Sequence, residues 1–375
     1  MHTLQPPDIT TLIETLARRG YTVVGPTVRD GAVVFDTLRS AEDLPRGRRD
    51  VQAPGSYALT AADDGALFAH HCGPTSPKRF LFPPRQHLFT ARRSGKGFSV
   101  EVPGGDGTPR EARYAFVGVK ACELAAIRIQ DRVFNQGEHV DALYAGNRRD
   151  TFVVAVNCTT AGETCFCASM GTGPAAKEGY DLVLTELTEA GAHYFTAEAG
   201  TPAGEAVLAE VPHGEASPAD RARAEALVAA AARSMGRSLE LDGLPKALAG
   251  NFEHHGWDDV ARRCMACANC TMVCPTCFCS TVEDTTDLAG TQADRVRRWD
   301  SCFTLDFARV AGGNFRTTTR SRYRQWLTHK LSSWVDQFGT PGCVGCGRCI
   351  TWCPVGIDIT EEAKAVAAGA TTAGT

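Results

Sequence analysis

The chain has 375 residues, which predicts two or three domains if a domain takes about 150 residues. Hydrophobic residues make up 43% and charged residues 22%, which is ordinary usage and excludes wholesale disorder. The net charge of −4 gives no reason to expect nucleic acid or a membrane surface as a partner. The unusual feature is 16 cysteines in a chain far longer than a disulfide-stapled secreted scaffold.

The amino-terminal stretch, residues 1–19, does not resemble an export signal because prolines and acids interrupt it. The longest apolar run, Ala226–Ala232, is too short to cross a bilayer. We therefore expect a cytoplasmic protein without a membrane partner, in which thiols stay reduced. Reduced thiols in this number favour metal binding or redox chemistry over disulfide bridges.

Residues 1–250 predict a mixed α/β domain. Runs of β-branched and aromatic residues predict strands at Tyr21–Val28, Ala32–Leu38, Phe98–Val102, Tyr114–Val119, Phe152–Val156, Leu182–Leu187 and Tyr194–Ala197. Helical spacing of apolar residues predicts helices over Ile9–Arg18 and Cys122–Val133. A third helix is expected from Pro218 to about Met235, with Ser217 as its capping residue.

Four cysteines of this domain follow predicted strands or lie in the loop between them. They are Cys122, Cys158, Cys165 and Cys167. Neighbouring strand ends could bring the four thiols together as ligands of an iron–sulfur cluster, which would be the third in the chain after the two predicted below. The alternative is that they are small buried hydrophobic side chains, as free cysteine often is.

Eleven of the 16 cysteines lie between Cys264 and Cys353, so we place a domain boundary near residue 250. Two runs in residues 251–375 share the spacing C-x2-C-x2-C-x3-C and are each followed by proline. The first run is Cys264, Cys267, Cys270 and Cys274, and the second is Cys343, Cys346, Cys349 and Cys353. This spacing is typical of bacterial iron–sulfur proteins, in which each iron takes one soft thiolate ligand.

In two-cluster proteins of this type the fourth cysteine of each run ligates the other cluster. One [4Fe–4S] cluster is therefore predicted to take Cys264, Cys267, Cys270 and Cys353, and the other to take Cys343, Cys346, Cys349 and Cys274. Zinc or idle thiols are the alternative, but zinc sites do not need this four-cysteine spacing twice. Glycines at 342, 345 and 347 are expected to let the second loop approach its cluster closely.

The two runs are separated by 68 residues, which is much more than a compact ferredoxin needs. Amphipathic stretches at Leu288–Val310 and Tyr323–Phe338 are expected to fill this gap as helices. The predicted fold class is therefore α+β: a mixed α/β domain over residues 1–250, then a mainly helical two-[4Fe–4S] ferredoxin-like domain over residues 251–375.

The remaining cysteines have no ligand spacing of their own. Cys277 and Cys279 directly follow the first run, and Cys302 lies farther along. They are expected to pack around the clusters, or alternatively to form a second metal site or a sulfur-handling thiol. Cys72, beside His70 and His71, is expected to have no function, although a His-His-Cys group could bind a stray metal ion.

Two other patterns are weaker. The run Gly171–Ala176 fits G-x-G-x-x-A, but no strand directly precedes it, so a glycine-rich loop is the preferred interpretation. Arg320, Arg322 and Arg324 lie in a basic stretch that is either a docking face for an acidic partner or a solvated helix.

Seven runs of the sequence carry a resemblance to a known family. They are Lys78–Arg85, Gly118–Ile127, Cys165–Pro174, Cys264–Cys279, Arg297–Phe303, Arg320–Leu331 and Gly342–Thr360. The chain resembles the iron–sulfur β subunit of cytoplasmic [NiFe] sulfhydrogenases and the related A subunit of anaerobic sulfite reductase. The resemblance implies a subunit that carries electrons between a flavin- and NAD(P)-binding reductase subunit and a catalytic oxidoreductase subunit.

The sequence therefore predicts a non-catalytic electron-transfer subunit with two [4Fe–4S] clusters and a possible third, and with no catalytic residues of its own. A [NiFe] hydrogenase is the first choice of catalytic partner and a siroheme sulfite reductase is the second. One alternative is a free-standing iron–sulfur enzyme that reduces a small sulfur compound at Cys277, Cys279 or Cys302. The other is a redox-sensing or assembly module.

Overall fold

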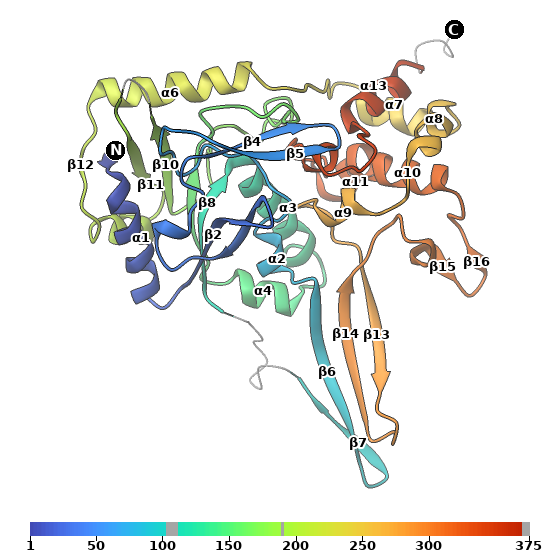
Figure 1. Cartoon of the computed structure of the whole chain (residues 1–375). Coiled ribbons are helices and arrows are strands. Elements are labelled where there is room, and N and C mark those ends of the chain that lie inside the picture. The colour runs from blue at the N-terminus through green and yellow to red at the C-terminus, as the bar shows by residue number, and fades with distance from the viewer. Residues whose placement is uncertain (103–111, 189–190, 370–375) are drawn as a thin grey trace.

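The computed structural model describes residues 1–102, 112–188 and 191–369. Its largest sheet has eight strands in the order β12-β1-β11-β10-β9-β8-β2-β3, on the left of Figure 1. The neighbouring strands β2, β8, β9 and β10 run parallel, and β1, β3, β11 and β12 extend the sheet by antiparallel pairing. The strands are β1 (His2–Leu4), β2 (Thr22–Arg29), β3 (Ala32–Thr37), β8 (Tyr114–Lys120), β9 (Phe152–Val156), β10 (Leu182–Leu187), β11 (Tyr194–Ala199) and β12 (Gly214–Glu215).

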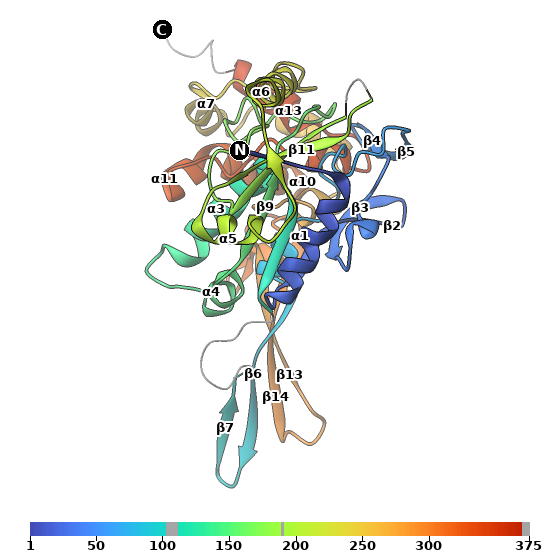
Figure 2. The same cartoon turned by 90° about the vertical axis from the view of Figure 1, so that its left-hand side faces the viewer.

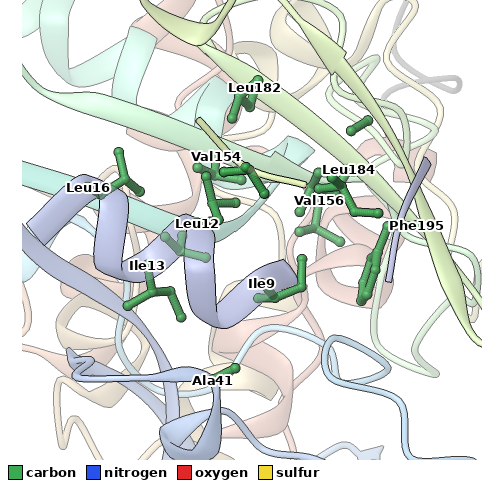
Figure 3. Packing of buried hydrophobic residues seen from close by; sticks show 14 of the residues in the cluster. Ile9, Leu12, Ile13, Leu16, Ala41, Val154, Val156, Leu182, Leu184 and Phe195 are labelled. Atoms are coloured by element: carbon green, nitrogen blue, oxygen red, sulfur yellow. The ribbon is translucent and has the colours of Figure 1, made fainter. Parts of the chain in front are cut away.

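Helices cover both faces of this sheet, which is why its central strands are apolar throughout. Helix α1 (Pro6–Arg18) turns Ile9, Leu12 and Leu16 toward one face, where Val154 of β9 lies (Figure 3). On the opposite face, α3 (Ala121–Asn135) packs its apolar residues against the alternate side chains of β8 and β9. The predicted strands and helices of this region are therefore confirmed.

Smaller elements complete the amino-terminal part. Helix α6 (Pro218–Arg233) begins at Ser217, whose side chain accepts a hydrogen bond from the backbone N–H of Asp220, as the sequence predicted. The others are the turn η1 (Ala41–Asp43), the hairpin β4 (Arg48–Ala53) and β5 (Ser56–Ala61), and helices α2 (Lys78–Leu81), α4 (Ala142–Arg148) and α5 (Pro202–Leu208).

A four-stranded arm projects from the body in both views (Figures 1 and 2). It joins hairpin β6 (Arg85–Ser94) and β7 (Gly97–Glu101) to hairpin β13 (Ser280–Thr286) and β14 (Gln292–Trp299) by pairing β6 with β14. The helix expected over Leu288–Val310 is therefore wrong, because residues 292–299 pair on both sides as a strand. The two hairpins come from opposite sides of residue 250, where the domain division stays a prediction.

The carboxyl-terminal part is otherwise mainly helical, as expected. Trp257, Leu327 and Ile350 are fully or almost fully buried at its centre. Its elements are α7 (Leu244–Gly250), α8 (Gly256–Arg263), α9 (Asn269–Met272), η2 (Leu305–Ala308), β15 (Arg309–Val310), β16 (Gly313–Asn314), α10 (Thr319–Thr328), the π-turn η3 (His329–Ser333), α11 (Trp334–Phe338), α12 (Arg348–Thr351) and α13 (Ile359–Ala368). Within the described ranges no helix is long and apolar enough to cross a bilayer.

Candidate metal centres

The two cysteine runs fold into loops of the same shape. In the first loop Ala266 and Ala268 have positive φ angles of 52° and 69°, and in the second Gly345 and Gly347 have 64° and 77° at the equivalent positions. The backbone N–H of Ala266 points at the Cys264 sulfur at 3.4 Å, and that of Gly345 points at the Cys343 sulfur at 3.5 Å. Each loop then enters a one-turn helix, α9 or α12. Backbone N–H groups therefore face sulfur in both loops, as iron–sulfur sites require.

The first loop and the end of the second enclose one cavity. Its lining includes Cys264, Cys267, Cys270 and Cys353, which we call the first cage, and also Cys349 of the second run. Phe303, Tyr323 and Trp326 form the apolar wall behind these sulfurs. Cys267 is exposed, whereas the other three thiols are partly buried, so the first cage lies at the molecular surface.

A second group of thiols surrounds Cys349. Its sulfur interacts electrostatically with those of Cys343, Cys346 and Cys274, and we call these four cysteines the second cage. The ammonium group of Lys330 is buried beside it and donates to the Cys274 sulfur at 3.3 Å, to the Thr276 hydroxyl at 3.1 Å and to the Gly342 carbonyl at 2.9 Å. A buried cation in contact with sulfur favours an anionic occupant of this cage.

The chemistry of both cages fits iron–sulfur clusters. Burial raises the pKa of the Cys270 and Cys343 thiols and raises that of Cys346 to about 12. These thiols would be deprotonated if they held iron, because coordination to a metal removes the thiol proton. Within the described ranges no group of three or more His, Cys, Asp or Glu side chains meets the geometry for holding a metal ion.

The amino-terminal cysteines also gather, at the carboxyl end of the sheet. Cys122 begins α3 after β8, and Cys158 follows β9, so parallel neighbours deliver both to one edge. The Cys165 sulfur interacts with Cys158 and Cys167 across this space. Gly118, with a φ of +80°, lies at a β-bulge in β8 and redirects the strand just before Cys122.

Cys72 lies in the middle of this group, although the sequence gave no sign of it. Its sulfur is 3.5 Å from that of Cys122 and interacts with those of Cys158, Cys165 and Cys167. We call these five residues the amino-terminal thiol group. No spacing motif links Cys72 to the others, because only the fold brings its loop to the sheet edge.

The amino-terminal thiol group is built against the second cage. A Cβ atom on Gly347 would lie 2.5 Å from the Thr164 hydroxyl, and one on Gly345 would lie 2.6 Å from the Phe166 backbone. The Phe166 N–H also donates to the Gly345 carbonyl at 2.8 Å. Gly345 and Gly347 therefore leave room for the backbone that precedes Cys167. The sequence had predicted a different role for them, which was to let the second loop approach its cluster closely.

A buried ion pair joins the same two regions. Arg348, inside the second cysteine run, pairs with Glu123, and both side chains are 1% exposed. The guanidinium group also donates to the carbonyls of Gly73 at 2.7 Å and Thr75 at 3.0 Å. Lys330 and Arg348 are functional candidates that the sequence did not reveal, because nothing in the sequence around a single charged residue shows that its side chain is buried.

Three cysteines belong to neither cage. Interaction with Cys274 is the largest cause of the raised pKa of the Cys277 thiol, and interaction with Cys302 is the largest cause that lowers the pKa of the Cys279 thiol to about 7. All three line one cavity beside Lys330. The sequence placed Cys277 and Cys279 near the clusters, but nothing in it paired Cys279 with Cys302.

The structure places both weaker motifs, and it agrees with the loop that was preferred for the glycine-rich run. The glycine-rich run at residues 171–176 lies in a loop, and Gly173 approaches Cys167 there. Arg320 and Arg324 both pair with Glu253, and Arg322 donates to the Phe303 carbonyl at 2.7 Å. These guanidinium groups are therefore engaged within the chain, which leaves the docking face without support.

Comparison with known proteins agrees with this geometry. Residues 263–357 match the 4Fe-4S dicluster domain. The chain is 32% identical over 285 residues to the β subunit of sulfhydrogenase 2 from Pyrococcus furiosus, an alignment that covers 75% of this chain and 80% of that protein. No solved structure matches the chain significantly. The chain therefore belongs to the sulfhydrogenase β-subunit family and contains a 4Fe-4S dicluster domain.

Proposed function

We propose that this chain is an electron-transfer subunit of a multisubunit oxidoreductase and holds at least two [4Fe–4S] clusters. The observation that carries the proposal is that the fourth cysteine of each run lies beside the first three cysteines of the other run. Cys353 lines the cavity of the first run, and Cys274 interacts with the three cysteines of the second run. When bound, each cluster supplies a site that accepts or donates one electron.

The chain's own residues set the properties of this relay. Exposed Cys267 brings the first cage to the surface, where a partner's redox centre can approach. Lys330 places a positive charge against the second cage, which stabilises the reduced and more negative state. Arg348 and the two close-packed glycines fix the second cage against the amino-terminal thiol group.

A third cluster in the amino-terminal thiol group would extend the relay. Cys158, Cys165 and Cys167 supply three ligands in this proposal, and Cys122 supplies the fourth. Its contact with Cys72 at 3.5 Å makes Cys72 the competing candidate for that position. A serine variant at each position decides between them, because only the ligand's removal lowers the iron content by about four per chain.

The partners are proposed from the family. Sulfhydrogenase 2 is the complex named for the Pyrococcus relative, so a [NiFe] hydrogenase is our first choice of catalytic partner and a siroheme sulfite reductase our second. A flavin- and NAD(P)-binding reductase subunit would supply or collect the electrons. All 16 cysteines are free thiols, which supports a cytoplasmic location where thiols stay reduced.

Anaerobic purification with iron and acid-labile sulfide counts tests the proposal. Two clusters give about eight irons per chain and three give about twelve, at four irons per cubane. Cys353→Ser should perturb the cluster of the first loop and Cys274→Ser that of the second, as seen by electron paramagnetic resonance. Cys277→Ser is the matched control and should keep the full iron count. An iron-free or zinc-filled chain would exclude the relay.

Electron transfer itself separates the relay from the sensing alternative. The purified complex should reduce the clusters with NAD(P)H through its flavoprotein and reoxidise them through the catalytic subunit. Copurified subunits then identify the partner directly. Clusters that take up no electrons from the flavoprotein would favour a sensing or assembly module instead.

A further inference from the structure

The four-stranded arm has one polar face and one apolar face. On the polar face Thr90 of β6 lies opposite Asp294 of β14, and its hydroxyl donates to the Asp294 carboxylate at 2.6 Å. Side chains one residue farther along a strand point to the other face. There Ala91 of β6 lies between Ala293 of β14 and Val100 of β7. The arm is therefore an amphipathic sheet, although it projects away from the body (Figures 1 and 2).

The apolar side of the arm extends over three neighbouring rows of residues. On one side of Ala91, the next row of the same face pairs Arg93 with Phe98. On its other side, the row pairs Phe89 with Arg295, whose guanidinium group lies over the Phe89 ring. We define the apolar arm face by its five apolar residues: Phe89, Ala91, Phe98, Val100 and Ala293.

Strand β7 has the sequence of a strand that is buried on one side. Apolar and polar residues alternate from Phe98 to Glu101, yet every residue of the strand is exposed. Phe98 is 74% exposed and Val100 is 50% exposed. Contiguous apolar patches that stay open on a folded chain mark sites of interaction. Among the described residues of the arm and its ends, five large apolar side chains are exposed: Phe98, Val100, Val102, Val282 and Leu288.

The β6–β7 hairpin is basic, whereas the whole chain is acidic. Residues 85–101 contain four basic side chains and one acidic side chain, while the net charge of the chain is −4. The acid, Glu101, pairs with Arg92. Arg93 lies on the apolar side of the arm, and Lys96 lies in the turn between β6 and β7. Among the residues that the structure describes, no carboxylate pairs with Arg93 or Lys96.

The arginines of the other hairpin are engaged within the chain. Arg295 pairs with Asp284, and Arg298 pairs with Glu283, so both pairs join β14 to β13. Positive charge that is open to a partner is therefore concentrated on the β6–β7 hairpin, at the border of the apolar arm face.

The base of the arm is fixed to the body. Arg297 of β14 pairs with Asp141, and the indole N–H of Trp299 donates to the Phe82 carbonyl at 2.9 Å. Strand β13 begins directly after Cys279, which closely follows the first cysteine run. A partner held by the arm would therefore keep a constant position relative to the proposed clusters.

We propose that the arm docks another subunit of the oxidoreductase complex, through a surface of that subunit in which carboxylates border an apolar patch. The inference rests on the proposed relay, because a relay needs a partner subunit. The carboxylates complement Arg93 and Lys96, and the apolar patch removes Phe98 and Val100 from water. A symmetric pairing of two arms is disfavoured, because it would bring two basic hairpins together.

A photo-crosslinker on the arm tests which molecule covers it. The full chain carries p-benzoylphenylalanine in place of Phe98, and the complex is purified anaerobically with its copurifying subunits and irradiated. We expect crosslinks to one partner subunit, near acidic residues, as located by peptide mass spectrometry. The same probe in place of Phe252, which is exposed outside the arm, should not label that segment. Crosslinks between two copies of this chain, or none, overturn the proposal.

Removing the apolar contact should weaken the complex. The double variant Phe98→Ser/Val100→Ser should bind the copurified partner subunit at least about tenfold more weakly, as measured by biolayer interferometry. Both positions are exposed, so the variant should keep its thermal midpoint and iron content. Val310→Ser, at an exposed position outside the arm, is the matched control and should bind normally. Normal binding by the double variant overturns the docking role of the apolar arm face.

Charge reversal tests the acidic border of the partner. Arg93→Glu/Lys96→Glu should weaken binding at least about tenfold at low salt, and high salt should reduce the difference from the unmodified chain. Lys364→Glu, at an exposed position of α13, is the control and should bind normally. Binding that does not change on reversal of both arm charges overturns the acidic partner surface.

Vesicles of phosphatidylglycerol test whether the arm binds an anionic membrane instead. We expect the unmodified chain to remain unbound in a flotation assay. Vesicle binding that disappears in Phe98→Ser/Val100→Ser would overturn the partner subunit as the occupant of the arm.

Iron counts separate failure of this inference from failure of the relay. If the arm variants bind the partner normally and the chain holds about eight reducible irons, the docking arm fails and the relay stands. If the chain holds no iron, the relay fails. The crosslinks then decide the inference alone, because a crosslink to another subunit supports the docking arm and its absence overturns it.

Discussion

At the scale of single residues, two buried cations organise the thiol sites. Lys330 and Arg348 are 2% and 1% exposed, and burial of an unpaired charge is costly. Lys330 contacts a cage sulfur, whereas Arg348 pairs with Glu123 in the amino-terminal part. One cation therefore adjusts the charge of a proposed cluster, and the other holds two regions of the chain together.

Replacing Lys330 with methionine should make the potential of the second-cage cluster more negative. The reduced cluster loses a nearby positive charge, and a one-electron couple moves by about 60 mV for each tenfold change in relative stability. We expect a shift of at least this order in an anaerobic redox titration. Lys364→Met, at an exposed position of α13, is the control and should leave the potential unchanged.

Replacing Arg348 with alanine should lower the free energy of unfolding by about 3–5 kcal/mol, because Glu123 is left buried without its partner. Thermal unfolding followed by circular dichroism measures the loss. The double variant Arg348→Met/Glu123→Leu removes both charges and should recover a large part of it. Equal losses in the two variants would mean that packing, not charge, makes the contribution.

The alkylation rate of Cys279 should follow the pH in a way that reports its interaction with Cys302. Because its pKa is lowered to about 7, half of the thiol is ionised near neutral pH, and the rate rises with pH through that value. Cys302 favours the thiolate most, Lys330 also favours it, and Asp300 opposes it. Cys302→Ala should move the midpoint upward, as measured by iodoacetamide labelling and peptide mass spectrometry.

At the scale of elements, two loops of one shape have different neighbours. Ala266 and Ala268 adopt the left-handed backbone conformation at the positions where the second loop has glycine. A side chain is therefore tolerated by the loop itself. Glycine is required in the second loop because the backbone of residues 164–166 lies within 3 Å of the positions that a Cβ would take.

Exchanging these residues tests that difference. Gly347→Ala should destabilise the chain by about 1–2 kcal/mol from backbone strain, with a further loss from the contact with Thr164. Ala268→Gly, the reverse change in the first loop, relieves the same strain and should be neutral or slightly stabilising. The midpoint of thermal unfolding and the iron content, measured for each variant, check these two expectations. Similar effects of the two changes would exclude the role assigned to Thr164.

At the scale of the whole molecule, the thiol sites form a series from the surface inward. The first cage includes exposed Cys267, whereas the second cage and the amino-terminal group include buried Cys346, Cys122 and Cys165. The second cage lies between the other two, since Cys349 interacts with Cys270 and Cys346 interacts with Cys72. Electrons would therefore enter or leave at the first cage.

Oxygen or a chelator should remove the proposed clusters one after another, starting with the most exposed site. Because access controls the oxidation of sulfur ligands, the first-cage cluster should be lost before the others. Limited exposure to air, followed by iron counts and paramagnetic resonance, should show loss in steps of about four irons. Simultaneous loss of all clusters would contradict the proposed arrangement.

Most strands and the covering helices followed from the sequence because apolar periodicity reports burial directly. Tyr114–Val119 and Ile9–Arg18 are examples, since each buries an apolar run that the sequence displays. The helix predicted over Leu288–Val310 was wrong, because part of this stretch pairs with β6, which lies about 200 residues earlier in the chain. Periodicity records the exposure of a segment but does not identify what covers it.

For the candidate site, the sequence by itself predicted the eight cysteines that we group into two cages, because cysteine spacing within a short loop is a local property. Only the tertiary structure brought Cys72 to Cys122, Cys279 to Cys302, and Arg348 to Glu123. Each of these contacts joins segments that the sequence separates by more than 20 residues. Local spacing cannot encode such contacts, because the sheet edge, the base of the arm and the packing of the second cage create them.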